Sequence, residues 1–295
     1  MSEVFDSLLE LSDRMYRVDR EPPPMLYHYA STAAVMSMLQ AREMWASDLR
    51  FQNDPRELKY AYEVFDAWRR KKSISRLCEA VVEQAFSQET ARHAFSLSFS
   101  AERDLLSQWR AYGEGGRGLC IGVDTYAIKA AQHVVASAET RLLLFPVIYD
   151  LSAQEDYLDR IFGAIFHVID SAGPTEPEED VVREAASFMR SYFYPLRVMF
   201  KHSAYRDEGE WRFVKIQPHR KMSDVRVRVN GANLIPYLPL RLAVDASGNA
   251  SFPLREIVLG PGRNVELDRA ALEIFLTSNG YGDVAVMASA IAFRG

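Results

Sequence analysis

The segment HAFSLSFSA, residues 93–101, alternates strictly between apolar and small polar side chains. Phe95, Leu97 and Phe99 occupy one set of alternate positions. Three serines occupy the other set: Ser96, Ser98 and Ser100. Because successive side chains of a β-strand point to opposite faces of a sheet, this segment is predicted to be a half-buried strand with a serine-bearing face.

A second predicted strand opens the segment YRDEGEWRFV, residues 205–214. Alternation sends Trp211 and Phe213 to one face. It sends three charged side chains to the other: Glu208, Glu210 and Arg212. Two carboxylates on one strand face repel each other and do not serve stability. In solvent they would carry no function, whereas in a cleft one of them could stabilise positive charge at a sugar carbon.

Outward from these strands, short strands and helices follow one another without a regular strand–helix–strand order. This order favours an α+β fold with a mostly antiparallel or split sheet and helical insertions. A run of prolines at residues 22–24 separates an amphipathic helix, predicted for residues 4–16, from the rest of the chain. We therefore expect an N-terminal helical arm over residues 1–24 and a single α+β domain over residues 25–295.

The composition narrows the class of protein. A net charge of -5 over 295 residues argues against a broad electrostatic grip on nucleic acid. Cys78 and Cys120 are too few for a disulfide framework and are expected to stay reduced. The N-terminus is acidic where a signal peptide would be basic, and no apolar run approaches membrane-spanning length. We expect a cytoplasmic protein that does not contact a membrane.

His28 lies at the end of the predicted strand MLYHYA, just before a capped helix. A histidine in a strand is often a purely structural residue. At this strand end, however, backbone donors and a neutral imidazole could hold the hydroxyl groups of a ligand.

Polar side chains crowd the segment WASDLRFQNDPRE, residues 45–57. They are Ser47, Asp48, Asn53, Asp54 and Glu57. Helix capping explains Asn53 and Asp54, but the density of carboxylates also suits a divalent cation.

Aromatic and glycine residues follow the serine row. Trp109, Arg110 and Tyr112 precede the turn GEGGRG, residues 113–118. An arginine with glycines and aromatic rings nearby suits a phosphate-bearing ligand that can stack. The turn does not fit a dinucleotide-binding fingerprint in its strand–turn–helix context.

Four segments together carry a family resemblance. They are LYHYAS, MWASDLRFQNDPRE, FSLSFSAERDLLSQWRAYGEGGRGLCIGV and FKHSAYRDEGEWRFV. On these the chain is identified as a member of a bacterial family known only as domain of unknown function 2971 (DUF2971), from about residue 25 to the C-terminus. The family name implies no activity.

The chain also resembles ADP-ribosyltransferases in its histidine on the first strand, its Ser-x-Ser strand and its late strand that opens with Glu-x-Glu. One class of that superfamily pairs the histidine with a later tyrosine and another pairs an arginine with Ser-x-Ser, and this chain mixes the two patterns. This resemblance implies a split, mostly antiparallel sheet that binds NAD as substrate. It implies that Glu210 is catalytic and that Glu208 positions or deprotonates the acceptor. The dinucleotide-binding residues would come from this set: His28, Tyr29, Ser47, Ser96, Ser98, Trp109, Arg110, Tyr112 and Arg212.

The resulting hypothesis is an enzyme that cleaves the nicotinamide–ribose bond and transfers ADP-ribose to an acceptor, with no resident metal. The resemblance suggests a role in a toxin or in phage defence. The sequence leaves the acceptor, protein or nucleic acid among others, and the oligomeric state open. One alternative is a metal-dependent nuclease or phosphohydrolase built on Asp48, Asp54, Glu57 and Glu210. Another is a non-catalytic module that senses a nucleotide.

Overall fold

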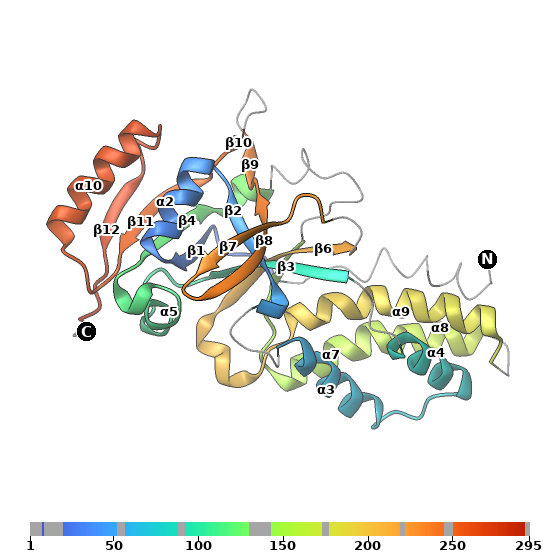
Figure 1. Cartoon of the computed structure of the whole chain (residues 1–295). Helices are drawn as coiled ribbons and strands as arrows, with labels where there is room; N and C mark the ends of the chain where they lie inside the picture. The colour runs from blue at the N-terminus through green and yellow to red at the C-terminus, as the bar shows by residue number, and fades with distance from the viewer. Residues whose placement is uncertain are drawn as a thin grey trace. The chain divides into compact units, whose positions relative to one another are not determined.

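The computed structural model describes Leu8 and residues 20–51, 57–87, 92–129, 143–172, 177–218, 222–244 and 250–292 (Figure 1). The helix predicted for residues 4–16 lies outside the described residues except for Leu8. The chain forms two compact units. Unit 1 comprises Met1–Arg20, Asn53–Arg92 and Val147–Tyr205, and unit 2 comprises Glu21–Gln52, His93–Pro146 and Arg206–Gly295. The single domain expected for residues 25–295 stays a prediction, because compactness does not show whether either unit folds alone.

Unit 1 is helical. Its helices are α3 (Glu57–Arg69), α4 (Arg76–Phe86), α7 (Leu151–Leu158), α8 (Ala164–Ala172) and α9 (Glu179–Met199), and the π-helical turn Asp159–Gly163 joins α7 to α8. Aromatic rings fill the space between them. The ring of Phe65 lies 5.1–5.6 Å from the rings of Trp68, Phe86, Phe162 and Phe193, measured between centroids. Such contacts add to the free energy gained by burying the rings.

Unit 2 contains a ten-stranded sheet. Its strands are β1 (Met25–Ala30), β2 (Met44–Asp48), β3 (Arg92–Ser100), β4 (Leu119–Asp124), β5 (Leu143–Pro146), β6 (Glu210–Pro218), β7 (Arg226–Asn230), β8 (Asn233–Leu240), β11 (Leu254–Leu259) and β12 (Ala285–Ala288). The main path runs β12-β11-β4-β1-β3-β2-β8-β7, with β6 beside β3 and β5 beside β6. The sheet is mostly antiparallel, and β11 and β12 form a parallel pair. The short strands β9 (Ala243–Val244) and β10 (Ala250–Ser251) pair separately. The predicted α+β class is confirmed, while an ADP-ribosyltransferase-like arrangement stays a prediction.

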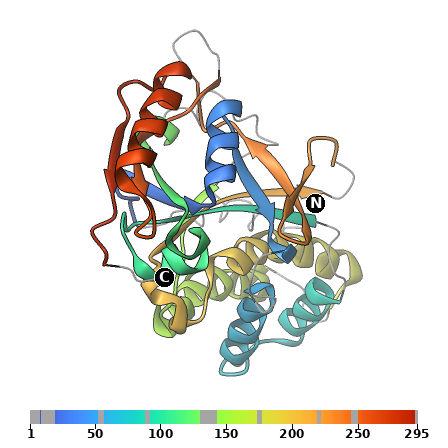
Figure 2. The ribbon, with the colours of Figure 1, turned by 60° about the vertical axis from the view of Figure 1, so that its left-hand side comes forward.

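The core lies on one face of this sheet. Phe95, Leu97 and Phe99 of β3 belong to the same buried cluster as Trp211 and Phe213 of β6. The helices α2 (Thr32–Ala41) and α10 (Val265–Ser278) contribute apolar side chains to that cluster and cover this face (Figure 2). The predicted alternation of both strands is confirmed for these residues.

The serine-bearing face lies opposite. Because side chains alternate, Ser96, Ser98 and Ser100 share this face with Glu210 and Arg212. The expectation of a half-buried strand is wrong in one respect, since Ser96 and Ser100 are each only 2% exposed. The β3 strand is therefore buried on both faces. Small serine side chains permit this because they leave little polar surface to satisfy.

The sheet branches at β3, which pairs with β1, β2 and β6. A strand has only two edges, so its partners must use different stretches of it. The β1 strand meets β3 at the pair Tyr27 and Ser100, whereas β2 meets it further back, at the pair Ser47 and Ser96. This branch point positions the candidate site.

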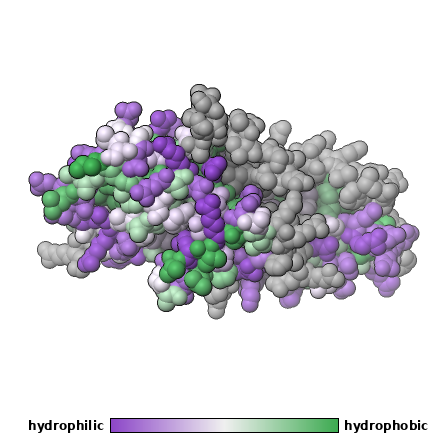
Figure 3. Space-filling model, turned by 45° about the horizontal axis from the view of Figure 1, so that its top comes forward, coloured by the Kyte–Doolittle hydropathy of each residue, from purple (hydrophilic) through white to green (hydrophobic). Residues whose placement is uncertain are grey.

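Three further properties concern the described helices, the surface and the cysteines. Among the described helices, none combines the length and the apolar character needed to cross a bilayer. On the side seen in Figure 3, hydrophobic residues form small patches among hydrophilic ones over the described surface, as is usual for surfaces in water. Cys78 and Cys120 are both buried and carry free thiols.

Candidate functional site

His28 is anchored where β1 departs from β3. Its Nδ1 lies 2.8 Å from the carbonyl oxygen of Ser98. A carbonyl only accepts hydrogen bonds, so Nδ1 carries the proton and donates it. The imidazole thus takes the place of a backbone donor at a point where the two strands no longer pair. Its ring also meets the ring of Phe99 in an edge contact, with 5.8 Å between centroids.

The imidazole of His28 is neutral at neutral pH. Burial lowers its pKa below the ordinary value, and the positive charge of Arg228 lowers it further, against the opposing effect of the Ser98 hydrogen bond. With the proton fixed on Nδ1, the other nitrogen, Nε2, has a lone pair that can accept a hydrogen bond. No described residue donates a hydrogen bond to Nε2. This arrangement suits a ligand hydroxyl, as the sequence predicts for His28.

Glu210 and Arg212 form a fork on the serine-bearing face. Arg212 donates from Nε and Nη2 to the two carboxylate oxygens of Glu210, over 2.7 and 2.8 Å. The residues are 7% and 1% exposed. Two parallel charge-assisted hydrogen bonds fix the plane of the carboxylate. The two residues therefore come together on one face, as alternation predicts.

Glu208 does not lie on the strand. It ends the 3-10 helix Ser203–Glu208, and β6 starts only at Glu210. Between them Gly209 has φ 52°, in the left-handed region that favours glycine. Strand alternation therefore stops at Glu210, and the predicted common face for Glu208 is wrong.

The turn before β6 is tied to the end of β3. Ser100 donates from Oγ to the carbonyl of Glu208 over 2.9 Å, and the amide of Ala101 donates to the carbonyl of Gly209 over 3.1 Å. The carbonyl of Ser98, which anchors His28, and the amide of Ala101, which anchors the turn before β6, are three residues apart in the chain, and Ala101 lies just past the end of β3.

Ser47 and Ser96 are paired directly across β2 and β3. Ser47 Oγ accepts a hydrogen bond of 2.9 Å from Nη2 of Arg228. The hydroxyl of Ser96 is buried and has no hydrogen-bond partner among the described residues. The structure therefore gathers three predicted ligand contacts, Ser47, Ser96 and Ser98, on one face.

Tyr29 and Trp109 lie in a separate apolar cluster. Their rings meet edge to face, 4.9 Å apart, and Trp109 is 0% exposed. Cys120 and Val258 complete the cluster. Trp109 also donates from Nε1 to a carboxylate oxygen of Asp104 over 2.6 Å. Packing already covers both rings, so the structure does not bring them together with His28 as surfaces for stacking nicotinamide.

The remaining predicted residues of this segment are exposed. Arg110 and Tyr112 follow Trp109 at the end of α5 (Leu106–Ala111), and Tyr112 is 40% exposed. The glycine-rich turn beside them is closely packed. A Cβ atom at Gly118 would lie 2.3 Å from the carbonyl oxygen of Ala30. Close backbone packing therefore accounts for this glycine without a phosphate.

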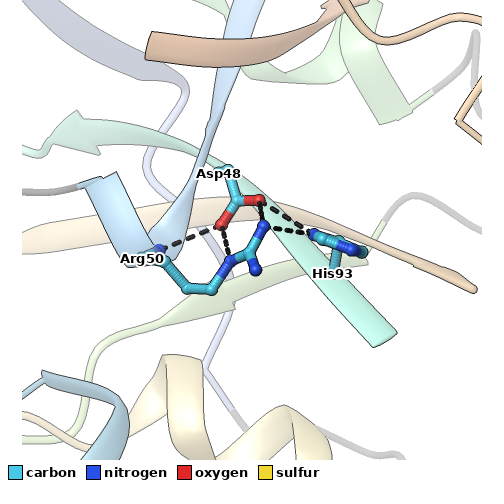
Figure 4. A network of polar contacts seen from close by, with 3 residues as sticks. All are labelled: Asp48, Arg50 and His93. Carbon is cyan, nitrogen blue, oxygen red and sulfur yellow. Dashed lines mark hydrogen bonds and ion pairs between the residues drawn. The ribbon is translucent and has the colours of Figure 1, made fainter. Parts of the chain in front are cut away.

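Asp48 belongs to a network with Arg50 and His93 (Figure 4). Arg50 donates to both carboxylate oxygens of Asp48, over 3.0 and 2.6 Å. Nδ1 of His93 lies 3.0 Å from Asp48 Oδ2 and 2.6 Å from Arg50 Nη2. Burial raises the pKa of Asp48, but the hydrogen bonds from Arg50 and His93 outweigh it and hold the pKa below the ordinary value of 3.8.

This network bears on the predicted cation site. Asp48 pairs with Phe95 and so lies on the apolar face, opposite Glu210. The two carboxylates therefore cannot converge on one ion. Within the described ranges, no three His, Cys, Asp or Glu residues could hold a metal. Asn53 and Asp54 lie outside the described residues, and so does the side chain of Glu57.

Sequence reasoning missed Arg228, which lies on β7 beside Ser47 and Trp45. The segment DVRVRVNG gives no local sign of a site, because alternating Arg and Val is typical of an ordinary strand. Only the pairing of β7 with β8 and of β8 with β2 brings Arg228 to the serine-bearing face.

A family model matches part of the chain. The family described as "Protein of unknown function (DUF2971)" matches residues 108–213. The predicted resemblance to that family is thereby confirmed for this segment, which includes Glu210 and Arg212. No curated protein and no solved structure matches the chain.

Proposed function

We propose that unit 2 binds NAD at the branch of the sheet and cleaves its nicotinamide–ribose bond, transferring ADP-ribose to an acceptor. One observation carries the proposal. A buried carboxylate, Glu210, is held by Arg212 on the serine-bearing face, on a strand that pairs with β3. His28 pairs with Ile121 of the apolar cluster, so alternation places its ring on the other face, and it would meet the ligand at the edge where β1 leaves β3.

Glu210 would stabilise the developing cation. When the bond between the ribose C1′ and the nicotinamide nitrogen breaks, its electron pair leaves with nicotinamide, which departs as a neutral molecule. The ribose becomes oxocarbenium-like, so a fixed anion lowers the energy of the transition state more than that of the bound substrate. An acceptor with an O–H or N–H group then bonds to C1′ and loses its proton, with Glu208 as the candidate base. No oxidant or reductant is needed.

The arginine fork is compatible with this role. A carboxylate has about four lone-pair positions, and the fork with Arg212 uses two of them. Because the fork fixes the carboxylate before substrate binds, little reorganisation is needed during the reaction.

The test is release of nicotinamide from labelled NAD in the presence of a cell lysate, with labelled macromolecules as the second product. Glu210→Gln should lower the rate roughly 100- to 1000-fold. Glu43→Gln is the matched control, because Glu43 is 6% exposed and also pairs with an arginine, Arg226, yet lies outside the site. Each variant is assayed below its own unfolding midpoint.

A second variant keeps the proposal testable if Glu210→Gln fails to fold. In His28→Gln the amide can still donate to the Ser98 carbonyl, while the ring acceptor Nε2 is lost. We expect its KM for NAD to rise. A wild-type protein that releases no nicotinamide, or a folded Glu210→Gln protein with the full rate, contradicts the proposal.

A further inference from the structure

Arg228 is a partly buried cation that forms no ion pair with any described residue. Its Nη2 donates to Ser47 Oγ over 2.9 Å, and its guanidinium carbon lies 5.5 Å from the centre of the Trp45 ring. Its Nε is buried and has no hydrogen-bond partner among the residues that the structure describes. Within the described parts of the chain, no carboxylate pairs with it. Burial lowers the pKa of Arg228, against an opposing effect of Tyr237, but an arginine side chain stays charged in proteins.

Neighbouring arginines differ from Arg228. Arg226, two residues earlier on the same strand, lies 3.1 Å from Glu43 Oε2, and Arg241 lies 3.5 Å from Glu43 Oε1. Taking a guanidinium out of water is costly unless an opposite charge accompanies it. Glu43 provides that negative charge for Arg226 and Arg241. No described carboxylate provides it for Arg228.

The groups around Arg228 would suit a nucleotide. Trp45 and Tyr237 place two aromatic rings beside it, 5.2 Å apart. Ser47 accepts from Arg228, so its own hydroxyl hydrogen remains available to donate. Ser96, directly opposite Ser47, has a second buried polar atom without a partner. Buried polar atoms without a partner are uncommon, and two of them on residues that flank Ser47 favour a polar partner that is not part of the described chain.

We propose that Arg228, Ser47 and Trp45 form a subsite for a nucleoside diphosphate, with the guanidinium and the serine hydroxyl on the phosphates and the indole against the base. This deepens the proposed function, on which it rests for the identity of the whole ligand as NAD. It assigns the pyrophosphate to Arg228, in place of Arg110 or Arg212. Arg110 lies at the end of α5, and Arg212 is committed to Glu210.

Tryptophan fluorescence gives a local measure of binding. Of the four tryptophans, Trp68, Trp109 and Trp211 are at most 2% exposed. Trp45 is half-buried and stands at the proposed subsite. Titration with ADP should quench the fluorescence of Trp45, and Trp45→Phe should abolish the change. Adenosine, which lacks phosphate, should bind more weakly than ADP.

Arg228→Gln should weaken ADP binding by roughly 10- to 100-fold, the usual effect of losing a hydrogen bond to a charged group. Arg226→Gln is the matched control and should leave ADP binding unchanged, because that guanidinium faces Glu43. Isothermal titration calorimetry measures both affinities. Arg228→Lys keeps the charge but not the planar fork, so it should bind ADP with intermediate affinity.

The outcomes separate this inference from the proposed function. If wild type does not bind ADP, or Arg228→Gln binds it as wild type does, the subsite is wrong even if nicotinamide is released from NAD. If ADP binding requires Arg228 but no nicotinamide is released, the subsite stands and the proposed transfer reaction is wrong. An unchanged quench in Trp45→Phe also overturns the inference.

Discussion

Strands β6 and β7 each bring an arginine to the serine-bearing side of the sheet, with opposite outcomes. Arg212 on β6 is 1% exposed and donates to both carboxylate oxygens of Glu210, two residues away. Arg228 on β7 contacts a serine hydroxyl and an indole ring, and its Nε has no hydrogen-bond partner within the described part of the chain. The sequence pattern of the two strands is similar, since each alternates charged and apolar residues. The difference teaches that a cation paired within its own strand serves the fold, whereas an unpaired one is suited to an anionic ligand.

The largest expected effect is the loss of stability when Arg212 is replaced. Arg212→Leu should lower the free energy of unfolding by about 3 to 5 kcal/mol, because it leaves the buried carboxylate of Glu210 without its cation. Urea denaturation followed by circular dichroism measures the change. Adding Glu210→Gln to this variant should recover part of the loss, since the uncompensated charge is then removed. A loss below about 1 kcal/mol would show that the ion pair of Arg212 with Glu210 contributes little to the stability of the fold.

A third arginine, Arg50, extends the comparison to an ion pair with one exposed partner. The side chain of Arg50 is 53% exposed, whereas that of its partner Asp48 is 1% exposed. Asp48→Asn should lower the free energy of unfolding at pH 7 by about 1.5 to 3 kcal/mol, the usual contribution of hydrogen bonds to a charged group. The folded pKa of Asp48 is below 3.8. Its contribution is therefore complete above the unfolded pKa and is lost as the pH falls through the folded pKa.

The measurement is a pair of urea titrations, for wild type and Asp48→Asn, repeated from pH 7 down to pH 3. The difference in unfolding free energy between the two proteins should shrink as the pH falls below about 4. A difference that stays constant, or grows, over that range would mean that the charge of Asp48 does not stabilise the fold.

The smallest expected effect on stability is that of Arg228→Leu. Because no ion pair is broken and a buried unpartnered nitrogen is removed, the free energy of unfolding should change by less than about 1 kcal/mol, in either direction. In Arg226→Leu the buried carboxylate of Glu43 keeps a second arginine, Arg241, so we expect a similarly small effect. Thermal and urea unfolding measure both. A loss above about 2 kcal/mol in Arg228→Leu alone would make Arg228 structural and end the contrast with Arg212.

Local pattern was sufficient for several elements of the fold. Alternation placed Phe95, Leu97 and Phe99 in the core together with Trp211 and Phe213, and all five are there. It works because a residue's face on a strand depends only on its position within that strand. The same rule fails at Glu208, since Gly209 leaves the extended conformation and the strand has not yet begun.

The candidate site was predictable only in part. Alternation predicted that Ser96 and Ser98 lie on one face of the strand. It could not predict that the ring of Tyr29 packs against the ring of Trp109. In β7 the usual expectation of valines inside is reversed. Val227 and Val229 are 60% and 72% exposed, while the side chain between them, Arg228, is partly buried.

The sequence by itself determined the α+β class, the apolar and serine-bearing faces of β3, and the charged start of β6, because each depends on residues close together in the chain. Tertiary structure alone decided which charges meet. Glu210 could have faced solvent, and Arg228 could have found a carboxylate, until the pairing of distant strands fixed their neighbours. Electrostatic partners depend on positions in space, and strand pairing across the chain sets those positions.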